Sequence, residues 1–273
     1  MKLPLTLTIA GSDSGGGAGI QADLKTFSAL GVFGMSVITA LTAQNTQGVQ
    51  GIYEIPPSFV ASQIDSIFQD MGAHAVKTGM LSNSEVIEVV ASKMKEYEVK
   101  NLVVDPVIVA KSGDRLLRKE AEETLIKRLL PIALVVTPNL SEAGVLAEME
   151  VISKENMKKA ASLIHMRGVL FVVVKGGHLG GEESIDLLYD GADYLEFMAP
   201  KIPTSNTHGT GCTFASAIAA FLARGEEVRE AVRKAKNYLT LTLEKSKDLR
   251  IGRGVGPMNH MALCTCAGKD RGE

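Results

Sequence analysis

A glycine-rich turn followed by an alanine-rich stretch is the segment of this sequence best suited to bind an anion. Gly209, Thr210 and Gly211 form the turn, and residues 214–223 are typical of a helix with a wide apolar face. The first N–H groups of a helix lack carbonyl partners, and the helix dipole adds positive charge there, so phosphate groups commonly bind at such an end. Cys212 lies in the first turn, where the same field is expected to lower the pKa of its thiol below about 8.5. The turn is therefore a candidate anion site with Cys212 as a candidate base; a helix with packing glycines and a buried cysteine is the alternative.

A second glycine-rich segment, residues 11–19, follows a predicted buried strand and precedes a predicted helix. It does not fit the dinucleotide-binding Gly-x-Gly-x-x-Gly pattern, because Ile20 and Ala22 stand where the third glycine is needed, nor the Walker pattern. Without side chains at most positions, the segment is expected to let a ligand approach the backbone closely. A flexible surface loop is the alternative.

Strand-like and helix-like segments alternate along most of the chain. The predicted strands cover residues 5–10, 36–43, 73–77, 101–107, 133–137 and 169–178, and the longer predicted helices cover 20–30, 58–71, 83–97, 154–167, 214–223 and 226–247. This alternation predicts an α/β fold with a mostly parallel sheet and helices on both faces. Asp190 and Gly191 separate two further strand-like runs, which predicts a hairpin and hence an antiparallel edge.

The composition is that of an ordinary globular protein. Of 273 residues, 45% are hydrophobic and 22% charged, with a net charge of −2, so no general attraction to nucleic acid or to an anionic membrane is expected. No apolar run reaches the roughly 20 residues of a membrane span, and we see no signal peptide. Three cysteines give no disulfide framework, which favours a reducing, cytoplasmic location. We predict a single domain over residues 1–260 and a poorly ordered tail over residues 261–273.

The end of the chain offers three potential zinc ligands, His260, Cys264 and Cys266. A structural zinc site needs four ligands, and the flanking sequence looks unstructured. We therefore predict no zinc site and assign no role to the two cysteines.

Six polar or charged residues and one methionine gather where the predicted strands end, and in an open α/β sheet these positions share one rim. They are Asp13, Gln44, Met80, Asp105, Asn139, Glu142 and Lys175. Asp105 and Glu142 are of the type that binds Mg²⁺ directly or through water, and Lys175 supplies a positive charge for a phosphate. Together with the glycine turn, this set suits phosphoryl transfer. Taken singly, the two carboxylates are also compatible with helix caps, and Lys175 with a solvated surface charge.

Seven segments of the sequence, taken together, resemble those of a known protein family. They are residues 11–23 (GSDSGGGAGIQAD), 42–46 (TAQNT), 77–81 (KTGML), 105–107 (DPV), 137–143 (TPNLSEA), 175–178 (KGGH) and 208–212 (HGTGC). In this order the series is similar to that of the hydroxymethylpyrimidine and phosphomethylpyrimidine kinases, the thiamin-pathway branch of the ribokinase superfamily. The resemblance covers about residues 3–260. It implies a ribokinase-like three-layer fold and an ATP- and Mg²⁺-dependent kinase of an aminopyrimidine alcohol and its monophosphate.

The resemblance also implies roles for individual residues. On the pyrimidine side, Gln44 and Asp23 resemble ligands of the ring, and Gly11, Met80 and Val107 resemble the pocket lining. The residues that resemble the Mg-ATP side are Asp105, Asn139, Glu142 and Lys175, with Asp105 and Glu142 as metal ligands. Gly209, Thr210 and Gly211 resemble the anion hole. Cys212 stands where most members of the ribokinase superfamily carry aspartate, and cysteine there is typical of this branch and of some pyridoxal kinases. Only small-molecule partners and a homodimer are expected, and the chain is too short for the second thiamin-pathway domain found fused in some relatives.

Two alternatives remain at this point. A pyridoxal kinase of the same fold is the nearer one, although Gln44 and Met80 argue against it. A non-catalytic pyrimidine-sensing module is the other; it requires a broken site, whereas Asp105, Glu142 and Cys212 are all present.

Overall fold

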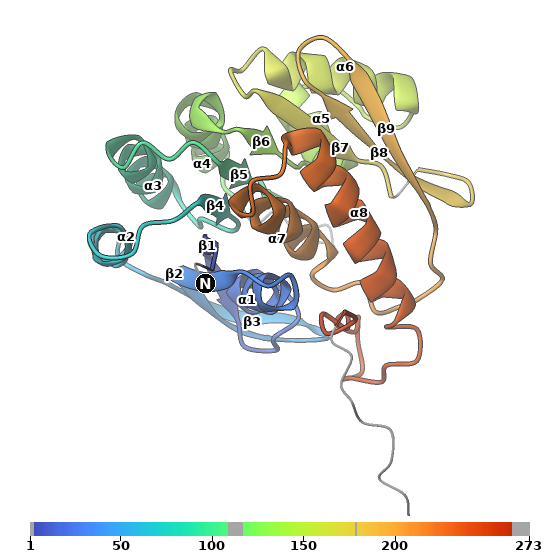
Figure 1. Cartoon of the computed structure of the whole chain (residues 1–273), viewed down its shortest axis with the longest axis horizontal. Coiled ribbons are helices and arrows are strands. Elements are labelled where there is room, and N and C mark those ends of the chain that lie inside the picture. Colours follow the sequence, from blue (N-terminus) through green and yellow to red (C-terminus); the bar gives the residue numbers. More distant parts are fainter. Residues whose placement is uncertain (1–2, 109–116, 178, 264–273) are drawn as a thin grey trace, which may run out of the picture.

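The computed structural model describes residues 3–108, 117–177 and 179–263. Within these residues the strands form a single sheet in the order β3-β2-β1-β4-β5-β6-β7-β8-β9 (Figure 1). The strands are β1 (Leu5–Asp13), β2 (Phe33–Asn45), β3 (Gly48–Glu54), β4 (Ala75–Thr78), β5 (Leu102–Val104), β6 (Val135–Val136), β7 (Phe171–Lys175), β8 (Glu183–Tyr189) and β9 (Tyr194–Pro200). The α-helices are α1 (Gly19–Ala29), α2 (Pro57–Phe68), α3 (Ser84–Glu96), α4 (Lys119–Thr124), α5 (Leu140–Ala147), α6 (Lys154–His165), α7 (Thr210–Ala223) and α8 (Val228–Glu244). After α4 the chain continues through a π-helical turn, η1 (Leu125–Leu129), and a 3₁₀ turn, η2 (Leu130–Ile132).

The centre of the sheet is parallel and both edges are antiparallel. Strands β2, β1, β4, β5, β6 and β7 run parallel to one another, and β8 and β9 add an antiparallel hairpin beyond β7. This confirms the predicted fold class and the predicted antiparallel edge. Sequence reasoning missed β3, which pairs antiparallel with β2 at the opposite edge. Every residue of β3 is exposed and two are glycines, so the strand carries no alternation of buried and exposed residues that could be recognised.

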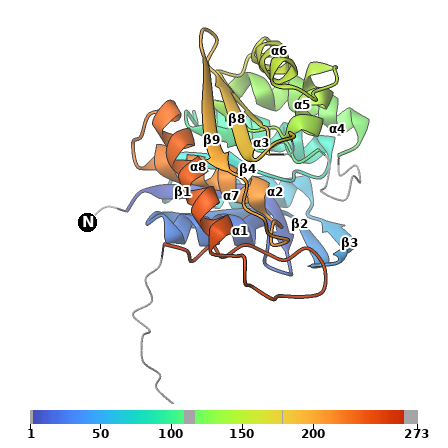
Figure 2. The same cartoon turned by 90° about the vertical axis from the view of Figure 1, so that its right-hand side faces the viewer.

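Helices cover both faces of the sheet and make two separate cores (Figures 1 and 2). Helices α1, α7 and α8 lie on one face, and α2, α3, α5 and α6 on the other. Because neighbouring strand residues point to opposite faces, Val103 of β5 packs with Phe214 and Ile218 of α7, whereas Leu102 and Val104 pack in the other core. The result is the three-layer arrangement expected of a parallel sheet. None of the described helices is both long enough and apolar enough to cross a bilayer.

Strand β1 is longer than predicted and carries the first part of the glycine-rich segment. It continues through Gly11 and Ser12 to Asp13, and α1 begins at Gly19. A Cβ atom at Gly19 would lie 2.4 Å from the carbonyl oxygen of Gly11, and Gly19 has φ +56°. Glycine at this position therefore lets the start of α1 fold back against the end of β1, at the rim where the parallel strands end.

Candidate functional site

A cavity of about 500 Å³ runs along the rim formed by the carboxyl ends of the parallel strands. All the predicted site residues except Asp23 line it. These are Gly11, Gln44, Met80, Val107, Asp105, Asn139, Glu142, Lys175, Gly209, Thr210, Gly211 and Cys212. The fold thus brings residues from seven separate sequence segments to one hollow of a size that holds small-molecule ligands.

Asp23 does not line this cavity, and the prediction that it contacts a ligand there receives no support. Its carboxylate is fully buried on the inner side of α1. It accepts hydrogen bonds of 2.6 Å from the hydroxyls of Thr8 and Ser216, and Nζ of Lys77 lies 2.9 and 3.1 Å from its two oxygens. One turn into α1, the side chain points into the packed layer between helix and sheet instead of toward the glycine-rich segment that precedes the helix.

The start of α7 forms the predicted turn, and it is built around glycine. Gly209 precedes the first residue of the helix with φ +86°, and no side chain caps the helix end. A Cβ atom at Gly209 would lie 1.9 Å from the carbonyl oxygen of Gly17, so only glycine allows this contact between the two glycine-rich segments. The N–H groups of Gly211 and Cys212, in the uncapped first turn, are therefore available to a ligand in the cavity.

A lysine–aspartate pair borders this turn. Nζ of Lys175 donates a hydrogen bond of 3.0 Å to Oδ1 of Asp105. A Cβ atom at Gly211 would lie 3.3 Å from Nζ of Lys175 and 3.6 Å from Oδ2 of Asp105, so the pair and the turn are in contact. Burial alone would lower the pKa of Lys175, but the carboxylates of Asp105 and Glu142 outweigh it and raise the pKa. Lys175 therefore keeps its positive charge beside the start of α7, where an anion would bind.

Glu142 and Asn139 form a capping box at the start of α5. Oδ1 of Asn139 accepts a hydrogen bond of 2.9 Å from the Glu142 N–H, and Oε2 of Glu142 accepts one of 2.8 Å from the Asn139 N–H. The other carboxylate oxygen of Glu142 lies 3.3 Å from the N–H of Ile108. Burial is the main cause that raises the pKa of Glu142; the carboxylate of Asp105 adds to it, and Lys175 opposes it. The capping alternative is thus correct for Glu142, and it is compatible with a ligand role because the residue also lines the cavity.

The carboxylates of Asp105 and Glu142 suit a magnesium ion that arrives with a nucleotide. Within the described residues there is no group of three or more histidine, cysteine, aspartate or glutamate side chains placed to hold a metal. Mg²⁺ commonly takes only one or two protein carboxylates and completes its shell with phosphate oxygens and water. Asp105 and Glu142 both line the cavity, and the carboxylate of Asp105 helps to raise the pKa of Glu142, an effect that a divalent cation would oppose. Their donor chemistry therefore fits Mg²⁺.

The prediction of a lowered pKa for Cys212 was wrong. Burial raises the pKa of this thiol to about 11, and the carboxylates of Asp23 and Asp105 also act against ionisation. The ammonium of Lys77 and the N–H of Gly19 oppose this rise but do not overcome it. The partial charge at a helix end is small compared with the cost of removing a thiolate from water next to two carboxylates. Cys212 is accordingly a neutral thiol near pH 7 when the cavity holds no ligand.

The alkylation rate of Cys212 should reflect this raised pKa. Only the thiolate reacts with iodoacetamide, so modification should be slower than that of free cysteine at pH 8 and should keep increasing toward about pH 11. Peptide-resolved mass spectrometry across pH measures this site apart from Cys264 and Cys266. A rate that levels off below pH 8 would show instead that the helix end dominates.

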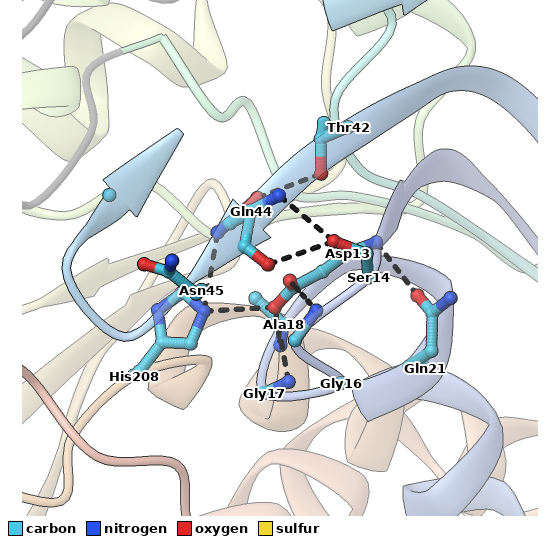
Figure 3. Close-up of polar contacts among 12 residues, drawn as sticks. Asp13, Ser14, Gly16, Gly17, Ala18, Gln21, Thr42, Gln44, Asn45 and His208 are labelled. Atoms are coloured by element: carbon cyan, nitrogen blue, oxygen red, sulfur yellow. Dashed lines mark hydrogen bonds and ion pairs between the residues drawn. The ribbon is translucent and has the colours of Figure 1, made fainter. Parts of the chain in front are cut away.

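Two residues whose roles sequence reasoning missed are Asp13 and His208. Figure 3 shows the Asp13 carboxylate at the centre of the glycine-rich segment, where it accepts hydrogen bonds from the N–H groups of Gly15, Gly17 and Ala18. His208 Nε2 lies 2.9 Å from the same carboxylate and 3.3 Å from the side-chain nitrogen of Gln44. The sequence feature that could have indicated these roles is the position of both residues inside glycine-rich motifs. Their contact, between residues 195 positions apart, depends on the fold.

A second unpredicted pair, Lys236 and Asp186, lines the same cavity. Nζ of Lys236 lies 2.7 Å from Oδ2 of Asp186 and donates a 2.9 Å hydrogen bond to the hydroxyl of Ser184, while Oδ1 of Asp186 accepts one from the N–H of Gly176. Both charged side chains are about 95% buried. The sequence feature that could have indicated this pair is a lysine on the inner face of the last predicted helix.

The side chain of His260 already contacts another side chain within the fold. It is buried, its Nε2 lies 2.9 Å from the hydroxyl of Thr213, and burial lowers its pKa to about 4. Cys264 and Cys266, the other two residues considered as zinc ligands, lie outside the described residues, as does most of the predicted tail.

Comparison with known proteins adds independent information about this chain. Residues 13–259 match the family model described as phosphomethylpyrimidine kinase. The chain is 51% identical over 257 residues to a hydroxymethylpyrimidine/phosphomethylpyrimidine kinase of Rhizobium meliloti, covering 94% of this chain and 96% of that protein. It is 52% identical over 255 residues to a bifunctional thiamine biosynthesis protein of Geobacter sulfurreducens. That match covers 93% of this chain but 52% of the relative, so the chain spans about half the length of the bifunctional protein.

Solved structures with a similar fold carry two different names. A phosphomethylpyrimidine kinase from Clostridium difficile superposes with a TM-score of 0.79 at 46% identity, covering 88% of this chain and 98% of that one. A pyridoxal kinase from Bacillus subtilis, solved as an ADP complex, superposes with a TM-score of 0.88 at 39% identity, covering 96% and 99%. The backbone alone therefore does not separate the two, whereas sequence identity is higher to the first.

Proposed function

This chain belongs to the phosphomethylpyrimidine kinase family, and on that premise we propose that it transfers phosphate from ATP, with Mg²⁺, to 4-amino-5-hydroxymethyl-2-methylpyrimidine and then to its monophosphate. The observation that carries this proposal is a single cavity lined by two chemically different groups of residues. One group comprises the start of α7, Lys175, Asp105 and Glu142, and the other comprises Gln44 and the residues that contact its side chain. The first suits a polyphosphate with its metal, and the second suits a flat polar ring.

On the phosphate side, the protein contributes charge and fixed position. The Gly211 and Cys212 N–H groups and the ammonium of Lys175 would stabilise the charge on the transferred phosphoryl group. Asp105 and Glu142 would hold Mg²⁺, which when bound neutralises phosphate charge and orients the oxygens. Because the Lys175–Asp105 pair already contacts Gly211, these groups need little movement to act on one phosphate.

On the ring side, Gln44 offers a donor and an acceptor side by side, which matches a ring nitrogen next to an exocyclic amine. Met80 and Val107 also line the cavity, and a Cβ atom at Gly11 would lie 3.5 Å from the Met80 methyl group. The glycine therefore leaves room for a ring beside β1. Asp23, which lies outside the cavity wall, has no part in this proposal.

The proposal is tested by the purified protein with three acceptors: the pyrimidine alcohol, its monophosphate and pyridoxal. ADP release is followed by a coupled assay, and the products are identified by mass spectrometry. We expect both pyrimidines to be phosphorylated with a higher kcat/KM than pyridoxal. Preference for pyridoxal would favour the kinase named in the second structural match, and absence of ADP release with every acceptor would favour a sensing module.

Replacement of Glu142 by glutamine tests the metal assignment. Glutamine keeps the shape and can still accept the Asn139 N–H, so the start of α5 should persist. Loss of the charge should raise the Mg²⁺ concentration needed for half-maximal rate and lower kcat, while the affinity for the pyrimidine stays within about twofold. Magnesium titrations of both proteins check this, and an unchanged requirement would restrict Glu142 to helix capping.

Replacement of Cys212 by alanine tests whether this thiol takes part in proton transfer. The alcohol must lose a proton during transfer, for which a base typically contributes about 10²–10⁴-fold, whereas the monophosphate is already an anion near neutral pH. The thiol is neutral near pH 7 when the cavity holds no ligand, so Cys212 can act as this base only where the bound metal lowers its pKa. If it does so, the first phosphorylation should suffer much more than the second in single-turnover measurements. Equal loss in both steps would assign Cys212 to packing or geometry.

Three broader expectations stay predictions: a single domain over residues 1–260, a cytoplasmic location, and a homodimer. Support for the dimer comes from the edge strand β3, where Val49, Ile52 and Tyr53 are exposed apolar side chains. Light scattering after size-exclusion chromatography measures the mass in solution. A mass of one chain at micromolar concentration would exclude a stable dimer.

A further inference from the structure

The contact between Asp13 and His208 fixes the position of one proton. Asp13 is 3% exposed, and its carboxylate accepts from three backbone N–H groups in addition to His208. Burial would raise the pKa of Asp13, but the hydrogen bonds from His208, Ala18 and Gly15 outweigh it and lower the pKa. The carboxylate is therefore ionised near neutral pH and can only accept. In the 2.9 Å contact the proton must lie on Nε2 of His208.

This proton determines which end of the Gln44 amide belongs next to the histidine. Nε2 of Gln44 lies 3.3 Å from Nε2 of His208, which places two donors against each other. At the other end, Oε1 of Gln44 lies 3.1 Å from the hydroxyl of Thr42. That hydroxyl has one proton, and the carbonyl oxygen of Ser12, 2.8 Å away, can only accept it. Two acceptors therefore face each other at this end of the amide.

Both mismatches are removed by the same change, a half-turn of the amide group. With oxygen and nitrogen exchanged, Oε1 of Gln44 becomes a second acceptor that shares the Nε2 proton of His208 with Asp13, and Nε2 of Gln44 donates to the hydroxyl of Thr42. The Thr42 contact becomes a hydrogen bond, and the His208 contact changes from two opposed donors to the longer arm of a shared hydrogen bond, without movement of any other atom. Different residues, on different elements, contact the two ends of the amide. Both contacts require the same orientation of the amide.

We propose that His208, oriented by Asp13, is a positioning residue that holds the Gln44 amide with its oxygen toward His208 and its nitrogen toward Thr42, and so sets the specificity of the ring pocket. This inference rests on the proposed function, because it assigns the ring that Gln44 binds. The main chain of Gln44 is held as well, since the hydroxyl of Ser14 bonds to both its N–H and its carbonyl oxygen (Figure 3). Gln44 can thus neither shift along β2 nor turn its amide over.

A fixed amide has a definite consequence for ligand choice. An amide has two N–H donors and two acceptor positions on oxygen, and this network uses one of each. One N–H and one acceptor position remain in a fixed order, which fits a 4-aminopyrimidine with its acceptor ring nitrogen and donor amine. A 4-oxopyrimidine presents the reverse order, a ring N–H and an acceptor oxygen. Only an amide free to turn over could pair with both rings.

The experiment compares 4-amino-5-hydroxymethyl-2-methylpyrimidine with its 4-oxo counterpart. Both are measured as acceptors by kcat/KM and as ligands by calorimetry, in the wild type and in His208→Leu, His208→Gln and Thr42→Val. His208→Gln keeps a donor near the position of Nε2, and Thr42→Val removes the hydroxyl at the other end of the amide without touching the segment before α7. His74→Leu is the matched control, because His74 is exposed and contacts the start of β1, at the opposite end of the strand from the cavity.

We expect the wild type and His74→Leu to prefer the 4-amino ring by about tenfold to a hundredfold, the cost of one or two unpaired polar groups. In His208→Leu and Thr42→Val this preference should fall to within about threefold, while the KM for ATP changes less than twofold. His208→Gln should restore most of the preference.

Three results decide against the inference. An unchanged preference in His208→Leu and Thr42→Val, even with lower rates, would show that these residues only support the fold. A His208→Gln protein that behaves like His208→Leu would show that the donor is not what matters. If the wild type neither binds nor phosphorylates the 4-amino ring, the proposed function itself fails and this inference falls with it. Phosphorylation by the wild type with an unchanged preference in the variants overturns the inference alone.

Discussion

Replacement of Lys77 by methionine is expected to lower the free energy of unfolding by about 3–5 kcal/mol, because it leaves a buried carboxylate without its cation. Lys77 and Asp23 are both fully buried, and Nζ of Lys77 lies 2.9 Å from Oδ2 of Asp23. After the substitution only the hydroxyls of Thr8 and Ser216 would remain to stabilise the charge. Urea unfolding of both proteins, followed by circular dichroism, measures the difference.

The double variant Asp23→Leu/Lys77→Met is the control for this prediction. It removes both charges and keeps similar side-chain volume, so it should recover a large part of the stability lost in Lys77→Met. If the double variant is instead destabilised by the sum of the two single changes, the loss reflects packing and not an unpaired charge. A loss below about 1 kcal/mol in Lys77→Met would mean that water reaches Asp23.

Replacement of Gly209 by alanine is expected to lower kcat by about 10²–10³-fold, the usual effect of losing a donor that stabilises transition-state charge. The added Cβ atom would lie 1.9 Å from the carbonyl oxygen of Gly17, a distance that backbone atoms cannot tolerate. The segment before α7 must then move away from the glycine-rich segment, and the N–H groups of the first turn move with it. Steady-state kinetics with the pyrimidine alcohol measures this loss.

Gly225, just after the other end of α7, provides a matched control. It has φ +87°, almost the same as Gly209, but a Cβ atom there meets nothing within 4 Å. Gly225→Ala therefore carries the same backbone cost of about 1–2 kcal/mol without the clash, and its kcat should stay near that of the wild type. If both variants lose activity equally, general loss of helix stability is responsible and the turn has no special part in charge stabilisation.

Local patterns were sufficient for most of the fold, because they reflect local physics. Buried parallel strands require continuous apolar runs, and helices on a sheet require apolar residues at helical spacing, so β5, α3 and α6 are visible in the sequence. Strand β3 was missed because none of its residues is buried. Because β3 pairs with β2 at the edge of the sheet, its sequence carries no alternation of apolar and polar residues.

The common location of the predicted site residues follows from the strand ends for a similar physical reason. Parallel strands bring their carboxyl ends to one rim of the sheet regardless of the loops that connect them. The sequence therefore predicts that Gln44, Asp105 and Lys175 lie together, and all three line the cavity. Asp23 does not line the cavity because its position follows from a helix: one turn beyond the rim, its side chain points into the layer below the site.

By itself, the amino-acid sequence determined the alternation of elements, the rim on which polar residues meet and, through its series of motifs, the family. Tertiary structure decided which of these residues face the cavity and in what state of charge. The pKa of Cys212 depends on burial and on carboxylates from α1 and the end of β5, and the orientation of Gln44 depends on a histidine 164 positions away. Both the charge of a side chain and the orientation of an amide depend on the residues that surround it in space. The sequence of the glycine turn or the presence of Gln44 alone therefore does not determine them before the chain has folded.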